Sequence, residues 1–120
     1  MYKRQQSFSA VDDEGNLVGS LGIQLHGGVA DLGMMVARDW RGRGVGSALL
    51  EAAIAWARSA DAHKVALQHW PTNGAAIALY DKFGFVEEGV LRRHYRRRSG
   101  ALWDAVVRGL ILDDSAPGGP

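Results

Sequence analysis

The sequence predicts one α/β domain in which helices pack on a mixed, mostly antiparallel sheet. Three observations carry this prediction. The first third of the chain has short apolar segments joined by tight turns, a glycine-rich loop then leads into an amphipathic helical segment, and strand-like and helix-like patterns alternate over the rest. We expect a single domain over residues 1–112 and a flexible tail over residues 113–120.

The first three strands are expected at Gln6–Val11, at 17–26 and at Val29–Val36. The turn 12–16 and the pair Gly27-Gly28 separate them, and connections this short allow only an antiparallel meander. In the second of these strands, 17–26, leucine and isoleucine recur at alternate positions, as in a strand with one buried face. The apolar set is Leu17, Leu21, Ile23 and Leu25.

A first helix is expected from about Val45 to Ser59, because apolar residues recur there at helical spacing. A strand at Val65–Trp70 should follow, parallel to the third strand because a helix intervenes. The apolar stripe of the helix consists of Val45, Leu49, Ala52, Ala53, Trp56 and Ala60.

A second helix is expected to begin at Asn73 or Thr72, either of which can cap it, and to end before Gly84. Two final strands, at 85–91 and 102–112, should flank the charged connection 92–100.

Composition excludes several classes of function. The net charge is only +1, so attraction of the whole molecule to nucleic acid or membrane is not expected. There is no cysteine, the histidines lack metal-like spacing, and no apolar run approaches the roughly 20 residues that span a bilayer. We expect a cytoplasmic protein that binds no metal and no membrane.

The loop from Arg41 to Gly46 joins an apolar strand to a helix, where free backbone N–H groups bind anions such as phosphate. A Walker-type loop is excluded, because Gly46 is followed by Ser47 and Ala48 rather than by lysine. A dinucleotide loop opens a strand–helix–strand unit, whereas this loop follows antiparallel strands. Glycines that serve only a tight turn are the remaining alternative.

Two ordered motifs resemble those of the GNAT superfamily of N-acetyltransferases. Arg41-x-x-Gly44-x-Gly46 is similar to the family's pyrophosphate loop, and the segment 73–85, with Asn73, Tyr80 and Gly84-Phe85, is similar to its Asn-x-x-Ala-x-x-Leu-Tyr-x-x-x-Gly-Phe segment. The resemblance extends from residue 6 to residue 112. It implies a GNAT-type fold, acetyl-CoA as co-substrate and transfer of an acetyl group to a primary amine.

The resemblance also implies roles for individual residues. Loop amides should hold the CoA pyrophosphate, strand backbone should pair with pantetheine, and one asparagine should lie near the pantetheine arm. The implied CoA-binding residues are Met34, Met35, Val36, Arg41, Gly42, Arg43, Gly44, Val45, Gly46, Ser47, Asn73 and Tyr80.

Tyr80 matches the tyrosine that, in many members of the family, donates a proton to the departing CoA thiolate. A placed acid of this kind accelerates transfer by about 10²-fold or more. Its spacing from Ala76 and Phe83 also fits a core aromatic whose hydroxyl reaches the surface. The catalytic role is the favoured interpretation.

The acceptor half of the site departs from the family pattern. Some related branches carry a glutamate base on the strand after the first helix, where this chain has Gln68, and an amide cannot take up the proton. Asp31, His69 or a water relay are substitutes, and the base stays unassigned. The basic run 92–98 is interpreted as a solvated or substrate-rim connection rather than a nucleic-acid site.

The chain also begins at what resembles the family's second strand, so we expect an N-terminally truncated version of the fold. The exposed sheet edge favours a homodimer. The acceptor amine, a small molecule or a protein N-terminus, is not specified by the sequence. The alternative function is a non-catalytic acyl-CoA-binding or interaction module with an incomplete acceptor site.

Overall fold

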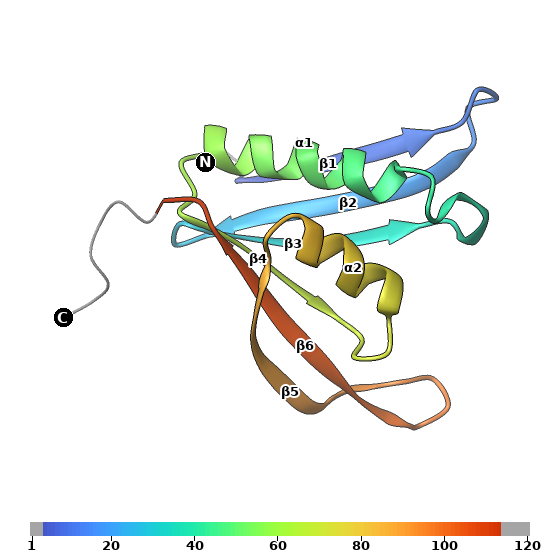
Figure 1. The fold of residues 1–120 in the computed structure, drawn as a ribbon, viewed down its shortest axis with the longest axis vertical. Helices are drawn as coiled ribbons and strands as arrows, with labels where there is room; N and C mark the ends of the chain where they lie inside the picture. Colours follow the sequence, from blue (N-terminus) through green and yellow to red (C-terminus); the bar gives the residue numbers. More distant parts are fainter. Residues whose placement is uncertain (1–3, 114–120) are drawn as a thin grey trace. The chain divides into compact units, whose positions relative to one another are not determined.

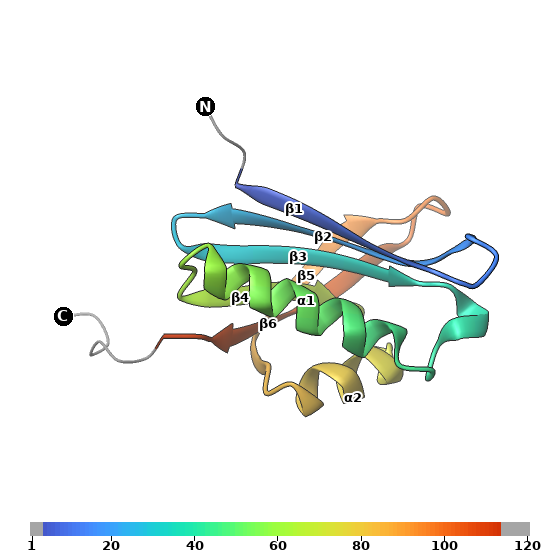
Figure 2. The same cartoon turned by 90° about the horizontal axis from the view of Figure 1, so that it is seen from above.

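Three antiparallel strands and one long helix form the first of two units into which the chain divides. The computed structural model describes residues 4–113, and this unit holds residues 4–65 and 111–113 of them. Strands β1 (Gln5–Val11), β2 (Leu17–His26) and β3 (Val29–Val36) pair in chain order. Helix α1 (Val45–Ser59) lies along one face of these strands (Figures 1 and 2). The predicted meander is confirmed.

The start of β2 corrects one predicted face. Leu17 is 63% exposed, whereas its neighbour Val18 is buried together with Leu21 and Ile23. The pairing register of β1 with β2 shifts between Ala10 and Val11. A bulge of this kind inserts one extra residue and changes the phase of the in–out alternation. Simple alternation along the sequence could not predict that change.

Helix α1 has the predicted bounds, but its buried face is turned from the predicted stripe. Leu49, Leu50, Ala53 and Ala57 are buried, whereas Ala52 and Trp56 are only half-buried. The small side chains of Ala53 and Ala57 let the helix axis approach the sheet, and the bulky Trp56 lies beside this line of contact.

Gly19 of β2 sets how closely the first turn of α1 approaches the sheet. A Cβ atom at this position would lie only 2.8 Å from Cγ1 of Val45 and 3.1 Å from Cδ1 of Leu49. Gly19 pairs with Val36, the last residue of β3. The end of β3 and the beginning of α1 are therefore held against the same point of β2.

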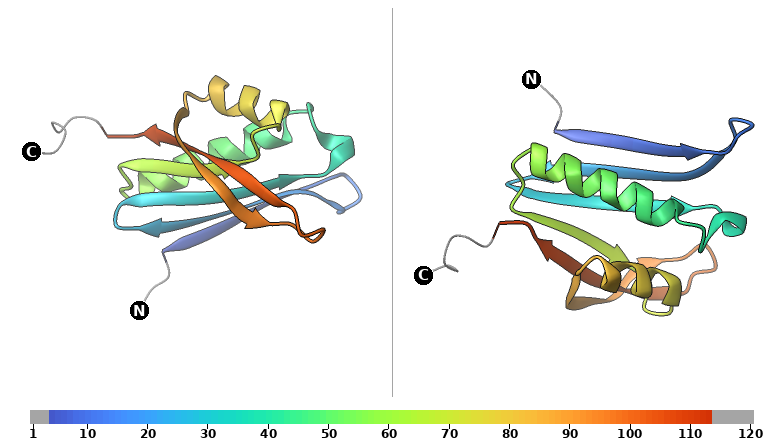
Figure 3. Two further views of the ribbon diagram at one scale, coloured as in Figure 1. Left: turned by 90° about the horizontal axis from the view of Figure 1, so that it is seen from below. Right: turned by 45° about the horizontal axis from the view of Figure 1, so that its top comes forward.

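The second unit, residues 66–110, is built from most of β4 (Lys64–His69), α2 (Gly74–Lys82), β5 (Val86–Arg96) and most of β6 (Leu102–Ile111). The strand order in this unit is β4-β6-β5, and β5 and β6 form an antiparallel hairpin (Figure 3). The apolar core residues of this unit are Leu67, Tyr80, Phe85, Ala105 and Val106.

The ends of α2 follow the predicted signals. Oδ1 of Asn73 accepts a hydrogen bond from the backbone N–H of Ala76, so Asn73 rather than Thr72 caps the helix. Gly84 has a φ of +88°, which a glycine adopts without strain and which ends the helix.

The predicted charged connection 92–100 is largely strand instead. β5 continues to Arg96, and the hairpin turn begins at Arg97. The register of the hairpin shifts between Leu91 and Tyr95, and Arg93 has a φ of +50°. Its backbone N–H donates to Oδ1 of Asp104 at 2.7 Å, which stabilises this irregular conformation. Consecutive arginines are typical of a solvated loop, but here they lie on an exposed part of the hairpin, where their side chains also reach solvent.

Residues 114–120 of the predicted tail lie outside the described residues. The single domain over residues 1–112 and the parallel pairing of 65–70 with 29–36 stay predictions.

Candidate functional site

The glycine-rich loop turns the chain from β3 into α1 within the first unit. A short 3-10 turn, Arg38–Trp40, follows β3, and the helix begins at Val45. Gly42 and Gly44 have φ values of +74° and +89°. Residues with a side chain rarely adopt these angles, so the two glycines are what permits this turn.

The first turn of α1 presents backbone donors without a cap. Gly44 is the N-cap residue and has no side-chain oxygen, and the helical ladder opens with the N–H of Ala48 donating to Gly44 O at 3.0 Å. The N–H groups of residues 45–47 precede that bond and lie at the positive end of the helix dipole. This arrangement can bind an anion such as a phosphate.

The two loop arginines rest on the backbone of the same segment. Nε of Arg41 donates to Val36 O at 3.3 Å, and a terminal nitrogen of Arg43 donates to Asp39 O at 3.4 Å. The guanidinium carbon of Arg43 also lies 4.1 Å from the centre of the Trp40 ring. Neither guanidinium pairs with a carboxylate among residues 4–113. Both positive charges can therefore attract an anion at the loop.

The segment Met34–Val36 forms the end of β3. It pairs with Gly19–Leu21 of β2, and the side chain of Met35 is 71% exposed. Gly19 lets this strand end lie close to α1. Along the chain, the segment is followed by the glycine-rich loop and then by the uncapped first turn of the helix.

Tyr80 of α2 lies in the core of the second unit, where only 5% of its surface is exposed. Its ring centre lies 5.7 Å from that of His69 and 5.8 Å from that of Phe85. The hydroxyl has no hydrogen-bond partner among residues 4–113, yet no fully buried polar side-chain atom there lacks one. The hydroxyl therefore reaches solvent.

Burial raises the pKa of Tyr80 above its ordinary value of 10.0, because desolvation disfavours the phenolate. The hydroxyl is consequently protonated at neutral pH and can donate a proton. These features match the interpretation of Tyr80 as a core aromatic whose hydroxyl reaches the surface, and its role as a proton donor stays a prediction.

Arg108 is a site residue that the sequence analysis missed. It is buried on β6, where Nε donates to Nε2 of His69 at 2.9 Å and a terminal nitrogen donates to Asp81 at 2.6 Å and to Phe85 O at 3.1 Å. A charged residue inside the apolar run 105–111 was the available signal, since lone buried charges are costly without partners.

The contacts of His69 fix its tautomer. Nδ1 lies 2.9 Å from the carbonyl oxygen of Trp70, which can only accept, so Nδ1 carries the proton and Nε2 accepts from Arg108. Both ring nitrogens are therefore occupied, and the histidine has no free lone pair with which to take a proton from an amine.

Gln68, the residue at the position of the missing glutamate base, is exposed and accepts a hydrogen bond. The hydroxyl of Tyr95 donates to its Oε1 at 2.6 Å. This bond joins β4 to the far end of the β5–β6 hairpin inside the second unit.

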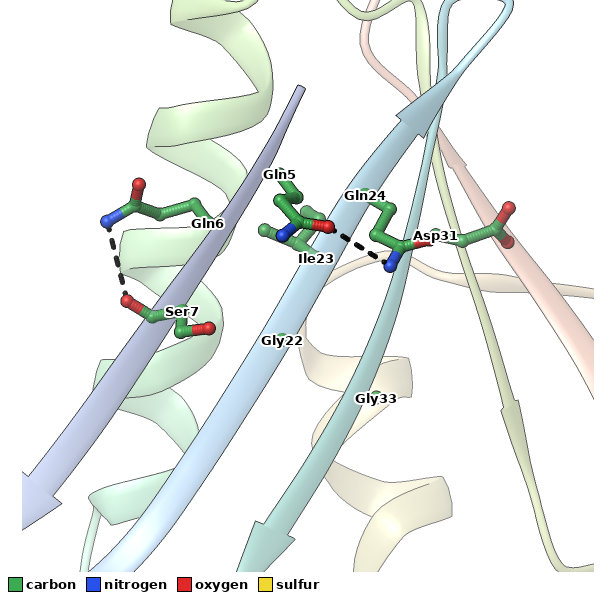
Figure 4. Close-up of a pocket in the computed structure, with 8 residues that line it drawn as sticks. All are labelled: Gln5, Gln6, Ser7, Gly22, Ile23, Gln24, Asp31 and Gly33. Carbon is green, nitrogen blue, oxygen red and sulfur yellow. Dashed lines mark hydrogen bonds between the residues drawn. The ribbon is translucent and has the colours of Figure 1, made fainter. Parts of the chain in front are cut away.

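Asp31 lines a shallow hollow of about 420 Å³ on the exposed face of β1, β2 and β3 (Figure 4). The hollow exists because Gly22 and Gly33 face each other across the β2–β3 ladder without side chains. Its polar lining includes Gln5 and Gln24, which are hydrogen-bonded to each other at 3.3 Å. The carboxylate of Asp31 has no hydrogen-bond partner among residues 4–113, and its role as a base stays a prediction.

Within residues 4–113, no group of three or more histidine, aspartate or glutamate side chains is arranged to hold a metal ion. No helix in that range is both long and apolar enough to cross a membrane.

Comparison with known families and relatives was made against this geometry. The model of the "Acetyltransferase (GNAT) family" matches residues 1–85. The chain is 35% identical to the L-amino acid N-acetyltransferase AaaT of Escherichia coli over 101 residues, which cover 77% of this chain and 60% of that protein. It is 34% identical to the uncharacterized N-acetyltransferase YobR of Bacillus subtilis over 74 residues, covering 62% of this chain and 28% of the relative.

The fold matches solved structures over most of the chain. The crystal structure of the ribosomal-protein-S18-alanine N-acetyltransferase from Escherichia coli superposes with a TM-score of 0.80 at 28% identity, covering 98% of this chain and 74% of that one. The predicted fold class is confirmed by this match. The chain spans less than two thirds of the length of the two curated relatives, 28% of one and 60% of the other.

Proposed function

The chain belongs to the GNAT family of acetyltransferases, and from this premise we propose that it transfers an acetyl group from acetyl-CoA directly to a primary amine. The observation that carries the proposal is the loop at Gly42 and Gly44, whose positive φ angles lead into an uncapped helix turn. That turn offers N–H donors and a positive dipole to the CoA pyrophosphate.

The proposed CoA contacts follow the family motif. The amides of residues 41–47 bind the pyrophosphate, with Arg41 and Arg43 adding charge, and the backbone of Met34–Val36 pairs with the pantetheine arm. The side chain of Asn73 uses one lone pair of Oδ1 to cap α2, which leaves its amide N–H₂ group available to pantetheine.

In the proposed reaction, the amine nitrogen attacks the thioester carbonyl carbon and the carbon–sulfur bond then breaks. The departing CoA thiolate takes a proton from the Tyr80 hydroxyl, and the amine releases its proton to water or to a base. The role requires a donor that is protonated at working pH, and the Tyr80 hydroxyl, whose pKa lies above 10.0, meets that requirement. Since His69 has no free lone pair, Asp31 and water remain the proposed routes for the amine proton.

The proposed acceptor is a small amine or a protein N-terminus. One relative is named for L-amino acids and one matched structure for an alanine of a ribosomal protein, so both kinds of acceptor occur among similar proteins. We also propose a cytoplasmic location and a homodimer. The absence of cysteine fits a reducing compartment, and β1 is an edge strand able to pair with a second copy.

Two measurements on the full chain test the function. Calorimetric titration with CoA should show binding, and acetyl-CoA mixed with a panel of amines should release free CoA thiol only when an accepted amine is present. Absence of CoA binding would contradict the proposal. Binding without turnover of any amine would instead favour a non-catalytic acyl-CoA-binding module.

A further inference from the structure

An arginine and three aromatic side chains form a connected cluster at the tip of the β5–β6 hairpin, and the proposed transfer reaction does not use them. Trp70 contacts Tyr95 and Trp103 edge to face, with ring centres 5.4 and 5.0 Å apart. The guanidinium carbon of Arg97 lies 4.8 Å from the ring centre of Trp70 and 4.5 Å from that of Trp103. We call Trp70, Tyr95, Arg97 and Trp103 the hairpin cluster.

The indole rings hold the charge of Arg97 in place without neutralising it. The two rings stand at 89° to each other, and the guanidinium lies over the face of both. The guanidinium of Arg97 has no hydrogen bond or carboxylate partner among residues 4–113. A fixed guanidinium with free N–H donors is suited to bind a planar carboxylate through two parallel hydrogen bonds.

The surroundings strengthen the attraction for an anion. Residues 92–98 contain five arginines, one histidine and no acidic residue. The nearby carboxylate of Asp104 already accepts the backbone N–H of Arg93. A cationic ligand would be repelled at this tip, whereas an anionic one is attracted.

The hairpin cluster is connected to the residues around Tyr80 within the second unit. His69 and Trp70 are consecutive: the ring of His69 contacts Tyr80, and the ring of Trp70 contacts Arg97. Tyr95 in turn donates to Gln68 of β4. A carboxylate bound at Arg97 would therefore lie beside Trp70, and the residue before Trp70, His69, contacts the proposed proton donor Tyr80.

We propose that Arg97, held against Trp70 and Trp103, binds a carboxylate carried by the acceptor amine. This inference rests on the proposed function and narrows its substrate class to amines with a nearby carboxylate, either free amino acids or peptides with an acidic side chain. Nucleic acid is disfavoured, because the guanidinium covers a face of each indole ring that would otherwise be open to stack on a base.

Two pairs of acceptors test the proposal on the full chain. The first pair is an α-amino acid and its amide, and the second is a peptide amide with glutamate at position two and its glutamine counterpart. In one or both pairs, the carboxylate member should have a kcat/KM about tenfold or more higher, the worth of a charge-assisted hydrogen bond. A preference in the first pair identifies free amino acids, and one in the second identifies acidic peptides.

Variants assign the preference to Arg97. Arg97→Gln should raise the KM for the carboxylate member to that of the neutral member of its pair. It should leave the KM for the neutral member unchanged. Arg97→Lys, which keeps the charge but loses the planar fork, should retain only part of the preference. The matched control is Arg98→Gln, which removes the same charge from the neighbouring residue and should keep the preference, because Arg98 contacts no aromatic ring in residues 4–113.

Equal use of both members of each pair by the unaltered chain would overturn the inference, as would an equal loss for both members in Arg97→Gln. A nucleic-acid site would replace the inference if the chain showed no carboxylate preference but bound RNA with an affinity that falls as salt rises. In that case Arg97→Gln and Arg98→Gln should both lose RNA binding. If no amine is acetylated, tryptophan fluorescence during titration with an N-acetyl amino acid and its amide still decides the inference. If the N-acetyl amino acid binds and Arg97→Gln abolishes that binding, the carboxylate site at Arg97 is supported although the proposed function has failed. If it does not bind, the inference is refuted together with the proposed function.

Discussion

Nε of Arg108 donates a hydrogen bond to Nε2 of His69 at 2.9 Å, between two side chains that are both buried in the second unit. The same arginine bonds Asp81 on α2 and the carbonyl of Phe85 after that helix. One cation therefore ties β4, β6 and α2 together around the ring of Tyr80. The orientation of the proposed proton donor depends on this network.

Arg108→Met should lower the free energy of unfolding by about 1–3 kcal/mol, because it leaves the buried Nε2 of His69 without a donor. Urea unfolding followed by circular dichroism measures the loss. Asp81→Asn is the control, since the Asp81 side chain is 61% exposed and its ion pair is screened by water. A loss in Arg108→Met no larger than in Asp81→Asn would contradict a structural role for the buried arginine.

Gly44→Ala should weaken CoA binding about tenfold, because alanine disfavours the φ of +89° that directs the first-turn amides. Gly15→Ala is a matched control: its φ is +85°, and in both positions a Cβ would meet no atom within 4 Å. Both variants should lose roughly 1–2 kcal/mol of stability from backbone strain. Calorimetry should show weaker CoA binding in Gly44→Ala alone, and an equal effect in both would argue against the loop as the pyrophosphate site.

Gly19→Ala should lower stability by about 1–3 kcal/mol, because the added Cβ would press on Val45, whose branched side chain has little freedom in a helix. It should also weaken CoA binding by displacing the first turn of α1. Gly22→Ala in the same strand meets no atom within 4 Å and should be nearly neutral. Thermal melts and CoA titrations compare the two variants. Equal melting temperatures and equal CoA affinities in Gly19→Ala and Gly22→Ala would contradict the close approach of α1 at Gly19.

Tyr80→Phe should lower the rate of acetyl transfer by about 10²-fold and leave CoA affinity unchanged, because it removes the proton donor and keeps the core ring. Steady-state kinetics and calorimetry on the same preparation separate the two effects. Full turnover in Tyr80→Phe would show that the residue serves the core alone.

Tyr80 should also make stability fall at alkaline pH. Its pKa in the folded chain is raised above 10.0, so the folded state holds the proton that the unfolded state releases. The stabilisation is fully present below pH 10.0 and is lost as pH rises through the folded-state pKa. Urea midpoints should therefore decline more steeply above that pH in the unaltered chain than in Tyr80→Phe. Parallel declines would contradict the raised pKa.

Local signals predicted the order of the elements well. Asn73 and Gly84 are strong helix-end signals, and the structure places the ends of α2 at them. The strand bounds at 29–36 were likewise fixed by two glycines and an apolar run. These features depend on neighbouring residues, so a single sequence is sufficient to predict them.

Features that depend on tertiary contacts were missed. The bulge opposite Val11 reversed the exposure of Leu17 and Val18. The hairpin of β5 and β6 extended the strand expected at 85–91 to Arg96, into the expected connection. The buried partners of Arg108 come from positions far apart in the chain, so no local pattern pointed to them. In the candidate site, the roles of the motif residues stay predictions from the sequence, whereas the network around Tyr80 could not be predicted from it.

The central claim is tested most directly by following an isotope-labelled acetyl group from acetyl-CoA to the acceptor with mass spectrometry. The full chain should be incubated with labelled acetyl-CoA and a panel of amino acids, peptides and simple amines. We expect the label on the amine nitrogen of at least one acceptor, together with one released CoA thiol for each acetyl group transferred. Unlabelled acceptors throughout the panel, with CoA bound to the protein, would contradict the assignment of the chain as an N-acetyltransferase.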